Sequence, residues 1–159
     1  MSIVNIKADK MRYQANSIPY LLVMLSVVIS IIATFQLINY DTFTLVVNSI
    51  RVVPDLRIGI EIAIGIVMML STFLAAEKVK FYDHFWSNIG LFILAGVNIF
   101  RIFNIPVYAF NQGWIPQKLV LITQAEFAAA ALLLIAAGII TTRKIIILKH
   151  HMKELAKHG

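Results

Sequence analysis

Residues 15–38 read ANSIPYLLVMLSVVISIIATFQLI, and this stretch decides the fold class because it carries no charge. An α-helix needs about 20 mainly apolar residues to cross the hydrocarbon core of a bilayer. Ser17 can cap such a helix, and Pro19 falls in the first turn, which tolerates proline. The run is too long for a signal-peptide core and lacks a small-residue cleavage site. We therefore expect it to be a retained transmembrane span.

Three further apolar runs follow along the chain. We expect the four spans at residues 18–38, 58–76, 85–103 and 119–140. The composition agrees, with 60% hydrophobic residues, 14% charged residues and a mean hydropathy of +0.83. The sequence thus predicts an all-α membrane protein, a bundle of four transmembrane helices. Residues 1–142 would form this domain, and residues 143–159 a separate basic tail.

The basic residues are unevenly divided between the two sides that these spans define. Ten lie on the side of the termini, at Lys7, Lys10, Arg12, Lys78, Lys80, Arg143, Lys144, Lys149, Lys153 and Lys157. Four lie toward the other side, at Arg51, Arg57, Arg101 and Lys118. The positive-inside rule then predicts that both termini are cytoplasmic. In a membrane protein the net charge of +6 indicates orientation and lipid contact, so we expect no nucleic-acid partner.

The two outer connections, residues 39–57 and 104–118, mix aromatic, proline and polar residues. Such chain is typical of the headgroup boundary, where Tyr40, Tyr108 and Trp114 suit an aromatic belt. Within the first connection, residues 45–53 fit either a short interfacial helix or a strand-like segment.

Five polar residues fall inside the predicted spans: Glu61, Asn98, Arg101, Gln124 and Glu126. From the helical rise, Glu61 and Arg101 lie about 6 Å below the outer face, Asn98 about 10 Å and Glu126 about 13 Å. An unpaired charge in a span costs about 2.5–3.5 kcal/mol, so we expect Arg101 to meet Glu61, Glu126 or both. Two acids against one base would leave a proton site, a cation site or a partner's cation at Glu126. The alternative is that these groups only hold helices together or reach the interface.

Small residues form a stripe on the fourth predicted span, with Ala130, Leu134, Ala137 and Gly138 near one face. Such a stripe lets two helices approach closely. We expect it to pack inside the bundle, and a partner's transmembrane helix is the alternative.

The predicted tail has apolar residues three or four apart, as in an amphipathic helix, with Lys144, Lys149, Lys153 and Lys157 mostly on other faces. It is expected to bind anionic lipid headgroups or to dock on a partner helix. The tail histidines His150, His151 and His158 indicate a solvated segment rather than a metal site.

Several kinds of chemistry lack their usual residues in this sequence. Cysteine is absent, which removes disulfides and thiolate metal sites. The four histidines lie at the edges of the predicted spans rather than inside them, where haem ligands would be needed. The sequence also contains no glycine-rich phosphate loop and no metalloprotease motif. We therefore expect neither a cofactor nor catalysis.

Three stretches, MRYQANSIPYLL (residues 11–22), LSTFLAAEKVKFYDHFW (70–86) and FRIFNIPVY (100–108), carry a resemblance. They resemble small four-span membrane proteins of low-GC Gram-positive bacteria, commonly encoded beside the permeases of carbohydrate-importing ABC systems. The positions that look familiar are Glu77, Lys78, Arg101 and Pro106. The resemblance supplies no catalytic residues. It implies an accessory or scaffold subunit of a transport complex in the bacterial plasma membrane.

These observations lead to one expected function and two rivals. We expect a non-catalytic accessory subunit of a larger membrane assembly, in which the Arg101 cluster fixes helix register. The first rival is a small oligomeric transporter in which Glu126 binds a proton or a cation. The second is an intramembrane enzyme that uses Glu61 or Glu126 as acid or base.

Overall fold

The computed structural model describes residues 6–39, 46–47, 50–51, 56–111, 113 and 115–158. In chain order the elements are α1 (Ile6–Met11), α2 (Ser17–Asn39), β1 (Val46–Val47), β2 (Ile50–Arg51), α3 (Leu56–Lys80), the π-helix η1 (Trp86–Gly90), α4 (Leu91–Phe103), α5 (Ile105–Asn111) and α6 (Gln117–His158). Four segments are long and apolar enough to cross a membrane: Ser17–Leu37, Gly59–Lys80, Trp86–Asn111 and Gln117–Lys157. This confirms the predicted helical, multi-span fold. The strands are a two-residue antiparallel pair, so the described part of 45–53 is strand-like.

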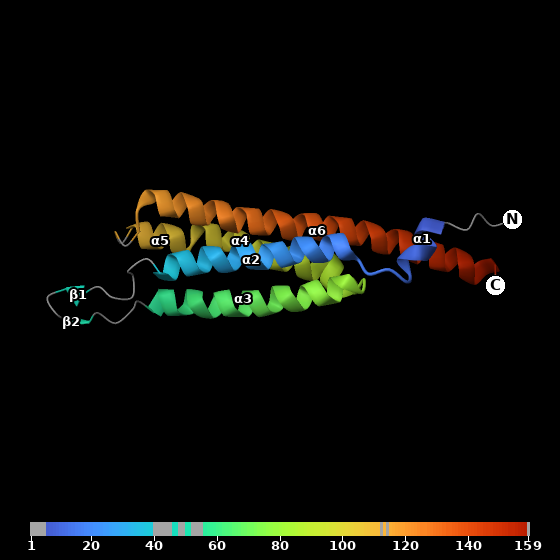
Figure 1. Ribbon diagram of the computed structural model, residues 1–159, viewed down its shortest axis with the longest axis horizontal. Coiled ribbons are helices and arrows are strands. Elements are labelled where there is room, and N and C mark those ends of the chain that lie inside the picture. The colour runs from blue at the N-terminus through green and yellow to red at the C-terminus, as the bar shows by residue number, and fades with distance from the viewer. Residues whose placement is uncertain are drawn as a thin grey trace.

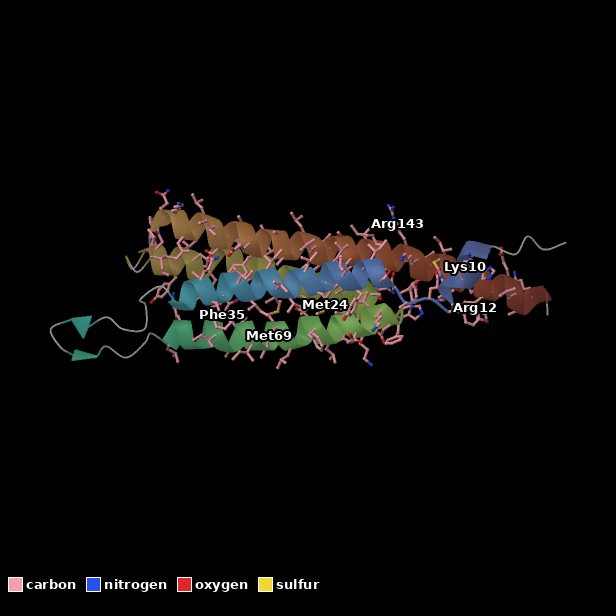
Figure 2. All side chains as sticks on the ribbon, viewed as in Figure 1. Lys10, Arg12, Met24, Phe35, Met69 and Arg143 are labelled. Atoms are coloured by element: carbon pink, nitrogen blue, oxygen red, sulfur yellow. The ribbon has the colours of Figure 1, made fainter. Side chains whose placement is uncertain are left out.

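The long helices run side by side along the longest axis of the molecule (Figure 1). Helix α2 packs against both α3 and α6, and α6 also packs against α4. Helix α3 packs less extensively against α4 than against α2, so the α3–α4 edge is the more loosely packed side of α3. The end of α6 and α1 lie at one end, which we call the terminal end, and β1, β2 and α5 lie at the other, the hairpin end (Figure 1). Lys10, Arg12 and Arg143 lie toward the terminal end, whereas Phe35 lies near the hairpin end (Figure 2).

The third span continues beyond its predicted end. We placed it at 85–103 and assigned 104–118 to a connection at the headgroup boundary, but the helix resumes as α5 after a break at Asn104. Pro106 is the second residue of α5. Proline is tolerated in the first turn of a helix, where its missing N–H would have no partner within that helix. The proline therefore interrupts the span without ending it.

The fourth span and the predicted tail form a single helix. Helix α6 has 42 residues, a length of about 63 Å at the usual helical rise. We expected a span at 119–140 and a separate tail from 143, but residues 141–144 are Thr-Thr-Arg-Lys and contain neither glycine nor proline to break the helix. The last turns continue past the bundle and pack beside α1 (Figure 1).

A short turn joins α3 to the third span at the terminal end. Tyr82 adopts a left-handed backbone conformation, with φ of 59°. The Tyr82 N–H donates to the Val79 carbonyl, and the Asp83 N–H donates to the Lys78 carbonyl. This pattern is a Schellman motif, which closes the end of a helix. The Asp83 side chain then accepts from the Trp86 N–H at 3.0 Å and starts the next helix.

The small-residue stripe of α6 packs against the chain's own helices. Ala130, Leu134 and Ala137 are each 0% exposed. A Cβ atom on Gly138 would lie 2.9 Å from the Phe92 ring of α4, so that ring covers the glycine. The Ser26 hydroxyl of α2 donates to the Ala130 carbonyl at 3.0 Å, which shows how closely α2 and α6 approach. Internal packing, not a partner helix, therefore covers these positions.

Candidate functional site

Arg101 lies on α4 and is 1% exposed. Its Nε and Nη2 atoms lie 2.6 and 2.5 Å from Oε1 of Glu61 on α3. Its Nη2 also donates to the Thr34 hydroxyl at 2.7 Å, and its Nη1 donates to the Ser30 hydroxyl at 3.2 Å. Both hydroxyls belong to α2. The sequence predicted that Arg101 meets Glu61, Glu126 or both, and in the structure it meets Glu61.

The fourth span, which is part of α6, contacts Arg101 through an aromatic ring. The guanidinium lies 4.2 Å from the ring centroid of Phe127 on α6, and Phe127 is 0% exposed. A planar guanidinium can hold several acceptors with its edge while its face stacks on a ring, which a lysine ammonium cannot do. Arg101 thus joins side chains of all four spans at one point. Chemically, this arrangement can fix how the helices sit against one another.

The α2 hydroxyls connect this centre to Asn98. Thr34 donates to the Ser30 carbonyl at 2.7 Å, and the Ser30 hydroxyl donates to Asn98 Oδ1 at 3.4 Å. The Asn98 amide donates to the Leu94 carbonyl at 3.3 Å, within its own helix. Glu61, Asn98 and Arg101 therefore lie together as predicted. Sequence reasoning missed Ser30 and Thr34, although their spacing of four residues at a depth similar to Arg101 was a usable signal.

A cavity of about 180 Å³ adjoins the Arg101–Glu61 pair at the hairpin end, where α3 faces the break between α4 and α5. Its lining consists of Arg57, Ile60, Glu61, Ile64, Asn104 and Ile105. Arg57 also packs over the Tyr108 ring, 4.3 Å from its centroid. Among the residues that the structure describes, no group of three or more histidine or acidic side chains is placed to hold a metal ion.

Gln124 does not join the Arg101 centre. Its amide donates to the Ile102 carbonyl at 3.1 Å, from α6 across to α4. In an unbroken helix the Ile102 carbonyl would accept from the N–H of residue 106, but Pro106 has no N–H. Gln124 therefore supplies the hydrogen bond that the proline removes. The available signal was a proline within an apolar run, which leaves the carbonyl four residues earlier without its helical donor, together with a glutamine on another span. Sequence reasoning did not use it.

Replacing Gln124 by leucine should cost about 1 kcal/mol of folding free energy, because the Ile102 carbonyl loses its donor. In a Pro106→Ala background the same substitution should cost less, since alanine restores an N–H near that carbonyl. Thermal unfolding of the four proteins in one detergent would give the double-mutant cycle. An equal cost in both backgrounds would contradict this role for Gln124.

Glu126 also lies apart from Arg101. Its Oε1 accepts from the Gln36 amide of α2 at 3.1 Å. Neighbouring residues on a helix point about 100° apart, so Phe127 faces Arg101 while Glu126 faces α2. Of the predicted alternatives the structure thus takes Glu61 as the partner of Arg101, and the predicted place of Glu126 in the same polar cluster is wrong. Glu126 instead borders a groove of about 390 Å³ between α2 and α6, with Ile29, Ile32, Ile122, Ala125 and Ala129 as the other lining residues.

A second polar cluster lies toward the terminal end, around Asn16, which is 0% exposed. Its amide donates to the Val79 carbonyl at 3.3 Å and to the Thr141 hydroxyl at 3.2 Å. Its Oδ1 accepts from Lys144 Nζ at 2.8 Å. Asn16 thereby ties the start of α2 to α3 and α6. Sequence reasoning missed this role, because asparagine before a helix normally suggests only a cap.

The tail residues divide into two groups. Lys144, predicted to contact lipid or a partner, donates to Asn16 within the protein. Lys149, Lys153 and Lys157 are exposed on α6. His151, which we expected in solvent, is only 4% exposed, because α6 continues as a helix beside α1.

Comparisons of the chain with protein-family models, with curated proteins and with solved structures found no match. The fold and the site alone therefore define its class. Four apolar helices fit a multi-pass membrane protein, and a buried arginine joins its four spans.

Proposed function

We propose that the protein is a non-catalytic accessory or scaffold subunit of a larger membrane assembly. The observation that carries this proposal is the use made of Arg101. Its guanidinium contacts Glu61 of α3, Ser30 and Thr34 of α2, and Phe127 of α6, so its hydrogen bonds and its stacking face are engaged within the bundle. Such an arrangement stabilises one relative placement of the helices, which is what a structural subunit requires.

The loosely packed edge between α3 and α4 supports the same proposal. Besides the Arg101–Glu61 pair these two helices make few contacts with each other. Ile60 on α3, which lines the cavity shared with the α4–α5 break, and Phe100 on α4 are 50% and 62% exposed. A partner's transmembrane helix could pack along this edge. The resemblance to proteins encoded beside carbohydrate permeases favours a solute importer as the assembly, and the distribution of basic residues favours cytoplasmic termini.

Photo-crosslinking in native membranes tests the proposal. A photoreactive residue at Ile60 or Phe100 should give a crosslink to a discrete partner protein, and mild extraction should recover a complex of fixed stoichiometry. Leu132 on α6 is 66% exposed and serves as the control position away from the α3–α4 edge. A monomer on extraction, without a crosslink from Ile60 or Phe100, would exclude an accessory role.

Proton- or cation-coupled transport is a second candidate, favoured by the position of Glu126 beside the groove between α2 and α6. If Glu126 is a coupling site, Glu126→Gln should abolish proton-linked flux in reconstituted vesicles while the protein still folds. Flux that persists in this variant would exclude Glu126 as the coupling group.

A further inference from the structure

The Gln36–Glu126 contact contains one hydrogen bond and two acceptors without a donor. The Gln36 amide nitrogen donates to Glu126 Oε1 at 3.1 Å. The other oxygen of each side chain, Gln36 Oε1 and Glu126 Oε2, is buried and has no hydrogen-bond partner among the residues that the structure describes. A buried acceptor without a donor destabilises the folded state, and here two such acceptors belong to residues already in contact.

One proton satisfies both oxygens. An ionised carboxylate only accepts hydrogen bonds, whereas a carboxylic acid carries one O–H donor. We propose that Glu126 is a proton-binding site inside the membrane: it is held as a neutral acid whose Oε2–H donates to Gln36 Oε1. The amide and the acid then each donate once and accept once, in a closed ring that joins α2 to α6. This inference does not depend on the proposed function.

The surroundings of Glu126 favour the neutral acid. The groove beside it is lined otherwise by three isoleucines and two alanines. Helices α2 and α5, which pack on this part of α6, contain no lysine, arginine, aspartate or glutamate, and their tyrosines are Tyr20 and Tyr108. Helix α4 contributes Arg101, which is bonded to Glu61. The described residues place no cation beside Glu126, and an ionised carboxylate without one is costly within a span.

The charged residues of α6 itself do not change this conclusion. The nearest along the helix are Lys118 and Arg143, eight and seventeen residues from Glu126 (126 − 118 and 143 − 126). At the helical rise these separations are about 12 and 25 Å. The remaining elements that pack on α6 are α1 and the π-helix η1, which lie toward the terminal end (Figure 1). Glu61 differs from Glu126 because it has a guanidinium beside it.

Infrared spectroscopy of the protein in lipid nanodiscs at neutral pH tests the proposal. The wild type should show the C=O band of a protonated carboxyl group, and Glu126→Gln should lose it. Glu61→Gln is the matched control and should keep the band, since Glu61 is ion-paired. In Gln36→Met the band should move to higher frequency, because the carbonyl loses the donor nitrogen. Absence of the band in the wild type, its survival in Glu126→Gln, or an unchanged frequency in Gln36→Met would overturn the proposal.

Thermal unfolding across pH gives a second and independent measurement. The folded protein would hold a proton that the unfolded chain releases once an exposed carboxyl ionises, so raising the pH through that range should lower wild-type stability. Glu126→Gln keeps a similar shape and can still donate to Gln36, so it should fold and should lack this part of the pH dependence. Parallel stability profiles for the two proteins would also overturn the proposal.

Discussion

Replacing Arg101 by leucine is expected to destabilise the folded bundle by about 3–5 kcal/mol. Glu61, which is 3% exposed, would lose both nitrogens of Arg101 that now contact it. Breaking a buried ion pair by removing one partner is costly, because the remaining carboxyl group must either stay charged without a cation or take up a proton, and in both cases it loses its partner. Unfolding of the purified protein in detergent, followed by circular dichroism or by trapping of the unfolded state, measures this loss.

The double variant Arg101→Leu/Glu61→Leu is the control for this prediction. Removing both charges leaves no orphan ion, and the Thr34 hydroxyl keeps its bond to the Ser30 carbonyl. The double variant should therefore regain most of the lost stability, as replacements of buried ion pairs by apolar residues often do. Arg101→Lys should fall between, since an ammonium cannot reach Glu61, Ser30 and Thr34 at once. A double variant as unstable as Arg101→Leu would show that the charge of Glu61 is not the cause.

The number and approximate positions of the spans could be predicted because hydrophobic length is a strong signal. The ends of the helices were harder to place. At Pro106 the residue type suggests a loop, but the span continues because Gln124 replaces the lost hydrogen bond. At Thr141 the composition changes from apolar to basic, yet composition alone does not end a helix. In the first case the helix depends on a contact with another span, and in the second it continues because no residue ends it. Local composition shows neither.

The depth of the candidate site residues in the membrane could be predicted, but the direction in which each side chain points could not. The rise per residue placed Glu61 and Arg101 at one level, and they do meet. Glu126 lies next to Phe127 in the sequence, and only the rotation of α6 decides which of the two faces Arg101. That rotation is set by the small residues that pack α6 against α2 and α4. Sequence reasoning missed Ser30 and Thr34 of α2 and Asn16 just before it, because a single hydroxyl or amide in an apolar run costs little energy and so gives a weak signal.

Gly65 is a position beside the buried arginine where a single added methyl group should destabilise the fold. A Cβ atom there would lie 2.9 Å from Thr34 Cγ2 and 3.6 Å from Arg101 Nη2. Thr34 cannot easily move away, because its hydroxyl donates to the Ser30 carbonyl and accepts from Arg101. We expect Gly65→Ala to cost about 1–3 kcal/mol, the usual range for overpacking a well-filled site. The same unfolding assay as for Arg101 measures it.

Two further variants separate overpacking from a general effect of alanine on the helix. Gly59 lies on the same helix and has nothing within 4 Å of an added Cβ, so Gly59→Ala should be neutral or slightly stabilising. Thr34→Ser removes Cγ2, the atom closest to the added methyl, and keeps the hydroxyl that Arg101 binds. In that background Gly65→Ala should cost much less stability, because its cost comes from the clash with Thr34 Cγ2 and not from loss of the bond between Arg101 and the hydroxyl. If Gly65→Ala loses as much stability in the Thr34→Ser background, the strain lies elsewhere on α3. The close approach of α2 and α3 beside Arg101 would then not be the reason that this position needs glycine.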